Sequence, residues 1–169
     1  MIEMPASIMK PARYTGIEPN RVLKDLTGVE VRFALCYPDI YEVGMSNMAI
    51  PILYGQLNAM PGVQAERVYA PWPDMEDLLR QNNLPLYSLE SRRPLGDFDV
   101  IGFSLGYELS YTTVLNMLDL AGLPVRSSDR TDQHPLVIAG GSCALNPEPM
   151  SDFIDAFFIG EAEESLQGL

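Results

Sequence analysis

The chain carries little positive charge. Its 169 residues include 11 lysines and arginines against 23 aspartates and glutamates, so the formal net charge is −12 at pH 7. Lysine and arginine neutralise phosphates in sequence-independent nucleic-acid binding, and basic segments hold proteins on anionic membranes. The composition therefore argues against direct nucleic-acid binding and against docking on a membrane surface.

The chain also has few cysteines and no long apolar run. Cys36 and Cys143 cannot form a disulfide framework, which predicts a reducing, cytoplasmic location. Two thiols are too few to hold an iron–sulfur cluster, and no spacing of metal ligands is present. Residues 1–13 lack the basic and apolar regions of a signal peptide, and the most apolar stretches, 100–105 and 156–159, are too short to span a bilayer.

Catalytic motifs are missing as well. The sequence contains no GxxxxGK[ST] or GxGxxG phosphate-binding motif and no GxSxG nucleophile motif. Its one histidine, His134, precedes Pro135 in a polar segment, where a turn residue is the expected role. Hydrolytic triads and Cys–His pairs need a positioned histidine, so no catalytic residue is assigned. Of the two thiols, Cys36 is expected in the core, and Cys143 is expected to be the more exposed.

What is present is the pattern of a globular α/β domain. Hydrophobic residues make up 47% of the chain, and its length is enough to bury a core. Residues 1–28 are interrupted by proline and glycine and are predicted to form an N-terminal arm. From residue 29 onward, short apolar runs alternate with helical stretches, which is typical of βαβ units. The expected strands are 31–36, 64–69, 86–89, 98–105, 136–139 and 156–159; the expected helices begin after Ser46 or Asn47, open at Asp74, and span 111–121.

For residues 29–169 this alternation predicts an α/β fold. We expect a Rossmann-like, flavodoxin-like three-layer sandwich whose mostly parallel sheet has about five strands. In open sheets of this kind, ligands bind beyond the carboxyl ends of the strands. Three segments follow expected strands and are rich in glycine or tyrosine: 37–46, 104–108 and 140–143.

These segments contain residues suited to a flat ligand. Glycine lets the backbone approach a ligand closely, and tyrosine offers an aromatic face with a polar tip. Taken singly, each glycine also fits an ordinary turn, and Asp39 fits a turn or helix cap. Their joint placement favours a binding site made from Asp39, Tyr41, Gly44, Ser104, Gly106, Gly140 and Gly141.

The same segments match a known motif. Asp39-Ile40-Tyr41-Glu42-Val43-Gly44, Ser104-Leu105-Gly106 and Gly140-Gly141 resemble, in order, the DxHxxG, SxL-type and GG elements of the cobalamin-binding domain that precedes many radical S-adenosylmethionine (radical SAM) enzymes. Longer segments, at 32–36, 70–75, 89–92, 146–149 and 159–164, are similar to the N-terminal region of one uncharacterised subgroup of these proteins. The resemblance covers residues 13–169.

The resemblance implies a cobalamin site with one departure from the motif. Tyr41 stands where the motif has the histidine that coordinates cobalt, and a neutral phenol with a pKa near 10 is a poor substitute for imidazole. The resemblance therefore implies either base-off cobalamin without a protein ligand on its lower face, or a degenerate domain that acts as an adaptor or substrate platform. A further alternative is an unrelated flavodoxin-like domain that binds another flat cofactor, such as a flavin.

The chemistry implied by the resemblance lies outside this chain. The CxxxCxxC motif that binds the 4Fe-4S cluster of radical SAM enzymes is absent here. The cluster and S-adenosylmethionine are therefore expected in a C-terminal radical SAM barrel, the implied partner of this domain, acting on an unknown substrate. Residues 160–164 resemble the acidic first turn of a helix that leads toward that barrel. The fragment alone is expected to be inactive.

Overall fold

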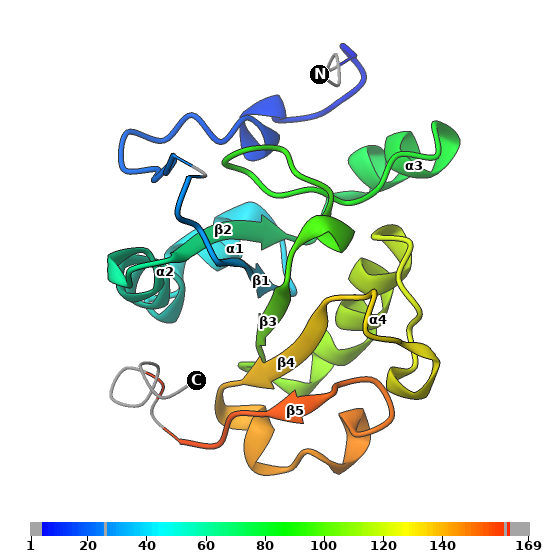
Figure 1. Ribbon diagram of the computed structural model, residues 1–169. Helices are drawn as coiled ribbons and strands as arrows, with labels where there is room; N and C mark the ends of the chain where they lie inside the picture. The colour runs from blue at the N-terminus through cyan, green and yellow to red at the C-terminus, as the bar shows by residue number, and fades with distance from the viewer. Residues whose placement is uncertain (1–4, 26, 161, 163–169) are drawn as a thin grey trace.

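The computed structural model describes residues 5–25, 27–160 and 162. It shows an α/β fold built on a five-stranded sheet, in which every pair of neighbouring strands is parallel and the order is β2-β1-β3-β4-β5 (Figure 1). This confirms the predicted fold class. The strands are β1 Val31–Tyr37, β2 Val63–Tyr69, β3 Val100–Ser104, β4 Leu136–Gly140 and β5 Ala156–Phe157.

Four α-helices among the described residues cover the two faces of the sheet. They are α1 Tyr41–Ser46, α2 Ala49–Ala59, α3 Pro73–Gln81 and α4 Tyr111–Leu120. Single turns of 3-10 helix lie at Pro11–Tyr14, Leu95–Asp97, Glu108–Ser110, Ser127–Asp129, Ser142–Leu145 and Glu148–Met150. No helix in the described part of the chain is long and apolar enough to cross a membrane.

The side chains of β1 point alternately to the two faces of the sheet and pack in two separate hydrophobic clusters. Ala34 and Cys36 pack in the larger cluster, with α3 and α4, while Leu35 and Tyr37 pack in a second cluster with α2. Successive strand residues point to opposite faces, so one apolar run can serve both clusters. Cys36 is fully buried, as predicted, and burial raises the pKa of its thiol.

Two of the expected helices are confirmed closely. Helix α4 follows Ser110 and is ended by Gly122, whose φ of 71° is the left-handed conformation common after a helix. The N–H of Ala49, at the start of α2, donates to the side-chain oxygen of Asn47 at 2.9 Å. The N-cap of the helix is Met48, without a side-chain cap, so α2 begins one residue later than a cap at Asn47 predicted.

Other expectations were wrong in detail. Residues 41–46 form α1 rather than loop, although Gly44 lowers helix propensity there, because contacts with the rest of the fold hold this turn. Helix α3 begins at Pro73, one residue before Asp74. Residues 86–89 form no strand of the sheet. Their one bridge pairs Tyr87 with Pro94, which has no N–H to extend a ladder.

The observed ends of two strands also differ from the predicted ones. β3 begins at residue 100 rather than 98, and β5 ends at Phe157 rather than 159. The N–H of Phe158 still donates to the Ala139 carbonyl at 2.8 Å, so the chain leaves the sheet gradually. In the helical turn expected at 160–164, residues 161, 163 and 164 lie outside the described residues.

Residues 5–25 run along the β2 side of the molecule, from α3 toward α2 (Figure 1). Ile8 and Tyr14 are buried, and the Tyr14 hydroxyl accepts the N–H of Trp72 at 3.0 Å. Further along, the N–H of Val22 donates to the Tyr54 hydroxyl of α2 at 2.7 Å. The segment is thus bound to the domain at several points along its length.

Candidate functional site

The strand order places a switch point between β1 and β3. From β1 the chain crosses to β2 on one side, and later returns to β3 on the other, so the loops after β1 and β3 diverge. The Tyr107 hydroxyl, after β3, donates to the carboxylate of Asp39, after β1. This hydrogen bond, with a smaller contribution from burial, raises the pKa of Tyr107 to about 12. The bridge joins the two loops across the switch point.

The loops after β3 and β4 are joined by three hydrogen bonds. The N–H of Leu105 donates to the Gly140 carbonyl at 2.7 Å, and the N–H of Cys143 donates to the Leu105 carbonyl at 3.1 Å. The Ser142 hydroxyl donates to the Gly106 carbonyl at 3.0 Å. These bonds bring Gly106 and Gly140 together at one edge of the sheet, as predicted for parallel strands.

Gly141 is required by this junction. Its φ is 103°, and a Cβ there would lie 2.6 Å from the Leu105 carbonyl oxygen. No side chain fits so close an approach, and the backbone conformation itself is one that only glycine adopts readily. The Gly-Gly pair therefore has a structural role whether or not a ligand binds.

An apolar pocket of about 250 Å³ lies on the α2 side of the sheet, over the ends of β3 and β4. Three predicted site residues line it: Ser104, Gly140 and Gly141. Gly102 also lines the pocket. A side chain at this position would clash with the Phe33 ring, which lies 2.6 Å from an added Cβ on Gly102. Sequence reasoning missed Gly102, although glycine inside a strand is a signal of close packing. The walls are Phe33, Leu35, Ala49, Leu53, Leu57, Phe103, Ile138, Ala139, Phe158, Gly160 and Ala162.

Tyr41 and Gly44 lie on the same face of the sheet as the pocket but farther along its carboxyl edge, toward β2. The Tyr41 hydroxyl donates to Glu18 at 2.7 Å, and its ring meets the Tyr69 ring edge-on with centroids 5.6 Å apart. Burial, reinforced by Glu18, raises the pKa of Tyr41 to about 12. A Cβ on Gly44 would lie 2.2 Å from the Tyr69 ring, so this glycine is explained by packing.

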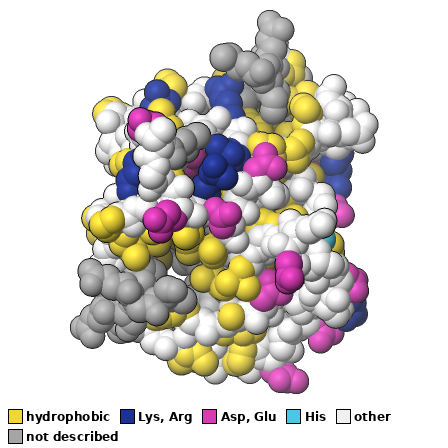
Figure 2. Space-filling model, viewed as in Figure 1, with side chains coloured by type: hydrophobic (Ala, Val, Ile, Leu, Met, Phe, Trp, Pro, Cys, Tyr) yellow, Lys and Arg dark blue, Asp and Glu magenta, His cyan; other side chains and the backbone are white. Residues whose placement is uncertain are grey.

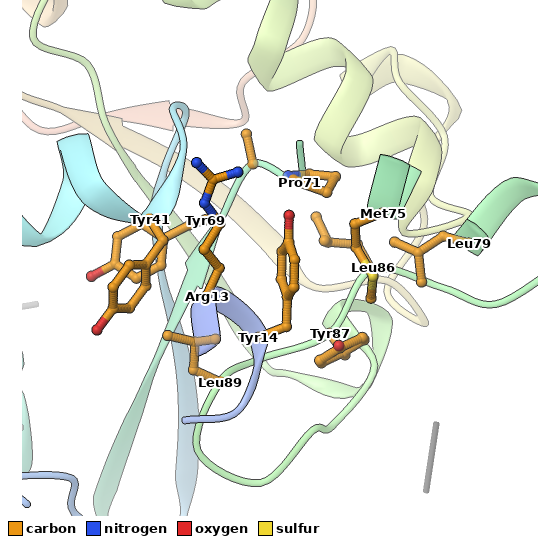
Figure 3. Close-up of a pocket in the computed structure, with 11 residues that line it drawn as sticks. Arg13, Tyr14, Tyr41, Tyr69, Pro71, Met75, Leu79, Leu86, Tyr87 and Leu89 are labelled. Carbon is orange, nitrogen blue, oxygen red and sulfur yellow. The ribbon is translucent and has the colours of Figure 1, made fainter. Parts of the chain in front are cut away.

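Figure 3 shows the small cavity that Tyr41 does line. Its volume is about 20 Å³, room for roughly one water molecule. Arg13 and Tyr14, from the segment before β1, fill its centre, with Tyr69 beside Tyr41 at one end (Figure 3). The structure thus separates Tyr41 from the large pocket that Ser104 and the paired glycines share.

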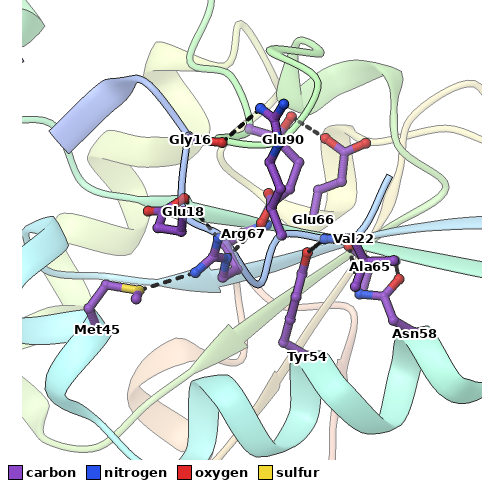
Figure 4. Close-up of polar contacts among 12 residues, drawn as sticks. Gly16, Glu18, Val22, Met45, Tyr54, Asn58, Ala65, Glu66, Arg67 and Glu90 are labelled. Atoms are coloured by element: carbon purple, nitrogen blue, oxygen red, sulfur yellow. Dashed lines mark hydrogen bonds and ion pairs between the residues drawn. The ribbon is translucent and has the colours of Figure 1, made fainter. Parts of the chain in front are cut away.

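A buried ionic cluster links β2 to Glu18 in the segment before β1 and to Glu90 in the segment after α3 (Figure 4). The Arg67 guanidinium donates to Glu90 at 2.6 Å and to Glu18 at 3.3 Å, and it stacks 4.8 Å from the centre of the Tyr54 ring. Burial raises the pKa of Glu90. Burial favours a neutral Glu18 too, but hydrogen bonds from Tyr41 and Arg67 hold the pKa of Glu18 below its ordinary value. Arg67 is 3% exposed, so its role is to hold neighbouring segments together rather than to meet a ligand.

The remaining candidate residues lie away from any solvent-facing site. Cys143 is 8% exposed and Cys36 0%, so Cys143 is the more exposed thiol, as expected, but it is still buried because the turn after Gly141 directs it into the core cluster that contains α4. His134 lies in a turn before β4, at the opposite edge of the sheet, and its Nδ1 accepts the N–H of Thr131 at 3.0 Å. In the described part of the chain, no three His, Cys, Asp or Glu side chains are grouped as metal ligands.

Comparison with known proteins relates the chain to a curated protein and to a family. The chain is 25% identical over 133 residues to uncharacterized protein MJ0966 of Methanocaldococcus jannaschii, an alignment that covers 78% of this chain and 24% of that protein. The chain thus spans about a quarter of the length of its curated relative. Residues 49–169 match the family described as "Radical SAM proteins, N-terminal". The matched residues include strands β2 to β5 and the loops that follow β3 and β4. Because the match covers more than half of the chain, the chain belongs to this family of radical SAM N-terminal domains.

Proposed function

We propose that this chain is a corrinoid-binding module that holds base-off cobalamin at the ends of β1, β3 and β4 for a radical SAM catalytic domain. The observation that carries the proposal is the 250 Å³ apolar pocket lined by Ser104, Gly140 and Gly141. An apolar cavity beside a few polar groups, at the carboxyl ends of parallel strands, is the usual form of a cofactor site.

The residues present fit the organic part of such a cofactor. Phe33, Leu53 and Ile138 offer apolar walls to an aromatic base, and the two glycines line the pocket without side chains of their own. Ser104 is half-buried at the end of β3 and offers a hydroxyl. Together these groups would bind and orient the base and keep water from it.

Among the described residues, those at the candidate site supply no ligand for cobalt. Tyr41 is turned toward Glu18 and the Tyr69 ring, and at neutral pH its raised pKa keeps it a phenol. The proposal is therefore a corrinoid without a protein ligand on its lower face. Bound cobalamin would supply methyl-transfer or rearrangement chemistry, and the 4Fe-4S cluster and S-adenosylmethionine would belong to the catalytic domain. The chain alone would position the cofactor or substrate and be inactive.

The proposal is tested by titrating the protein with hydroxocobalamin, desalting it and recording the visible spectrum of the protein fraction. We expect a co-eluting corrin spectrum of base-off type. Gly140→Leu should weaken binding at least tenfold, because its Cβ meets only ordinary contacts while the longer side chain enters the pocket. Gly55→Leu, on open surface of α2, is the matched control. A blank spectrum with wild type, or equal binding by Gly140→Leu, would refute the proposal.

A second function is favoured by the contacts of Tyr41. Because its hydroxyl is bonded to Glu18, the chain has no imidazole or free phenol at the position of the cobalt ligand. In this alternative the domain binds no corrinoid and serves as an adaptor or substrate platform of the same enzyme. A blank cobalamin titration would favour it. Titration with a flavin in parallel tests whether the pocket accepts another flat cofactor.

A further inference from the structure

Exposed hydrophobic side chains gather at the carboxyl edge of the sheet. Leu109 is 86% exposed, Leu145 72% and Met48 71%, and they follow β3, β4 and β1 respectively. Single exposed hydrophobics are common on protein surfaces, but several on adjoining loops indicate an interaction site. We define the apolar rim as Val43, Met48, Tyr107, Leu109, Leu145 and Ile159.

The rim is held by the fold. Leu109 lies between Tyr107, which bonds to Asp39, and Ser110, which is buried and whose hydroxyl donates to the Tyr107 carbonyl at 2.6 Å. Leu145 follows the fully buried Ala144. Side chains presented by loops fixed in this way lose little further backbone entropy when they are buried by a partner.

The charge of the rim restricts its partner. The segments 38–48, 105–110, 141–148 and 158–160 contain no lysine or arginine. Their acids are Asp39, Glu108 and Glu148, together with Glu42, which is paired with Arg13 and Lys10. A nucleic acid or an anionic membrane would be repelled. Two copies of this chain meeting rim to rim would bring these acids together, which disfavours a dimer through this surface. The complementary surface is apolar and flanked by lysine or arginine.

The course of the chain after β5 indicates which partner would carry this complementary surface. Strand β5 ends at Phe157, and residues 158–160 and 162 run along the same edge, where Phe158, Gly160 and Ala162 line the large pocket. Figure 2 shows hydrophobic side chains beside this part of the molecule. The curated relative is about four times as long as the matched segment, which covers 24% of it.

We propose that the apolar rim docks onto the radical SAM catalytic domain of the same polypeptide, through an apolar surface with basic neighbours. This inference rests on the proposed function in one respect, that the chain works beside such a domain. It does not require that cobalamin binds. In the docked state the catalytic domain would close the mouth of the pocket and exclude water from it.

The test places a photo-crosslinking amino acid at single positions of the full-length polypeptide. The positions are Leu109 and Leu145 on the rim, and Leu136 as the control, since it is 50% exposed at the amino end of β4. We expect crosslinks from both rim positions to peptides of the catalytic domain, at least tenfold more abundant than those from the control. Equal crosslinking from the control, crosslinks between two copies, or none at all would overturn the proposal.

A charge variant separates docking from cofactor binding. Leu109→Lys should reduce the Leu145 crosslink at least tenfold, because it sets a like charge against the basic partner surface. Leu136→Lys should leave that crosslink unchanged. Cobalamin titration of the same proteins is an independent readout: a blank titration with the crosslinks intact refutes only the proposed cofactor, whereas lost crosslinks with cobalamin bound refute only the docking.

Discussion

Substituting Gly141 by alanine tests the junction that shapes the candidate site. The native backbone at this position has φ 103° and ψ −177°, a region that is essentially restricted to glycine and costs other residues about 1–3 kcal/mol. The added Cβ would also lie 2.6 Å from the Leu105 carbonyl oxygen. Moving that carbonyl weakens its hydrogen bond from the N–H of Cys143, worth about 1 kcal/mol. We therefore expect a loss of about 3 kcal/mol in the free energy of unfolding.

Two other glycines provide matched controls. Gly122 has a positive φ of 71° but nothing within 4 Å of an added Cβ, so alanine there should cost only about 1 kcal/mol. Gly55 lies inside α2 with open space around it, and alanine there should stabilise the protein by up to about 1 kcal/mol. Urea unfolding followed by circular dichroism measures all three. If Gly141→Ala costs no more than Gly122→Ala, the close approach to Leu105 does not constrain the junction and the reasoning is wrong.

Two predictions concern the side of the domain that faces residues 5–25. Glu90→Ala leaves the Arg67 guanidinium buried with one weaker ion pair, to Glu18, and should lower the free energy of unfolding by about 3 kcal/mol. Asp152→Ala breaks an exposed ion pair with Arg126 and should cost under about 1 kcal/mol. Equal losses for the two variants in urea titrations would contradict this prediction. The hydrogen bond from Arg13 lowers the pKa of Glu42 from 4.5 to about 2, so its contribution to stability is complete above about pH 4.5 and is lost as the pH falls toward 2. Thermal melts should show Glu42→Gln losing less stability than wild type across that window, and parallel melting curves would refute the assignment.

The two halves of the carboxyl edge differ in the space that their described residues leave for a ligand. On the β2 side, the pair of Arg67 with Glu90 and the bond from Tyr41 to Glu18 fill the space between the sheet and residues 5–25. On the β3 and β4 side, the pocket remains open beside the glycines. A cofactor that needs the open side would meet Ser104 and Gly140, but it would not meet Tyr41 as its lower ligand. This division is why the proposed corrinoid is base-off.

Much of the fold could be predicted from local patterns. The apolar run at 101–103 is buried in the sheet, Val137 and Ala139 are buried in the next strand, and the helix at 111–120 ends at Gly122 as its sequence indicates. Failures occurred where distant contacts decide the conformation. Residues 41–46 are helical although Gly44 is among them. Residues 86–89 lie beside β2 with one backbone hydrogen bond, from the Leu89 N–H to the Arg67 carbonyl, rather than a ladder.

By itself, the sequence determined which residues stand at the ends of the strands, because apolar periodicity and turn glycines are local properties. It thereby determined that Gly106, Gly140 and Gly141 gather at one edge. Only the tertiary structure decided which side chains share a cavity. Tyr41 and Ser104 stand in two segments that resemble parts of one cobalamin-binding motif, yet Tyr41 bonds to Glu18, 23 residues before it, and Ser104 lines the pocket with Phe33 and Leu53. The direction of a side chain depends on partners far away in the sequence, and those partners meet only when the sheet, its helices and residues 5–25 have packed together.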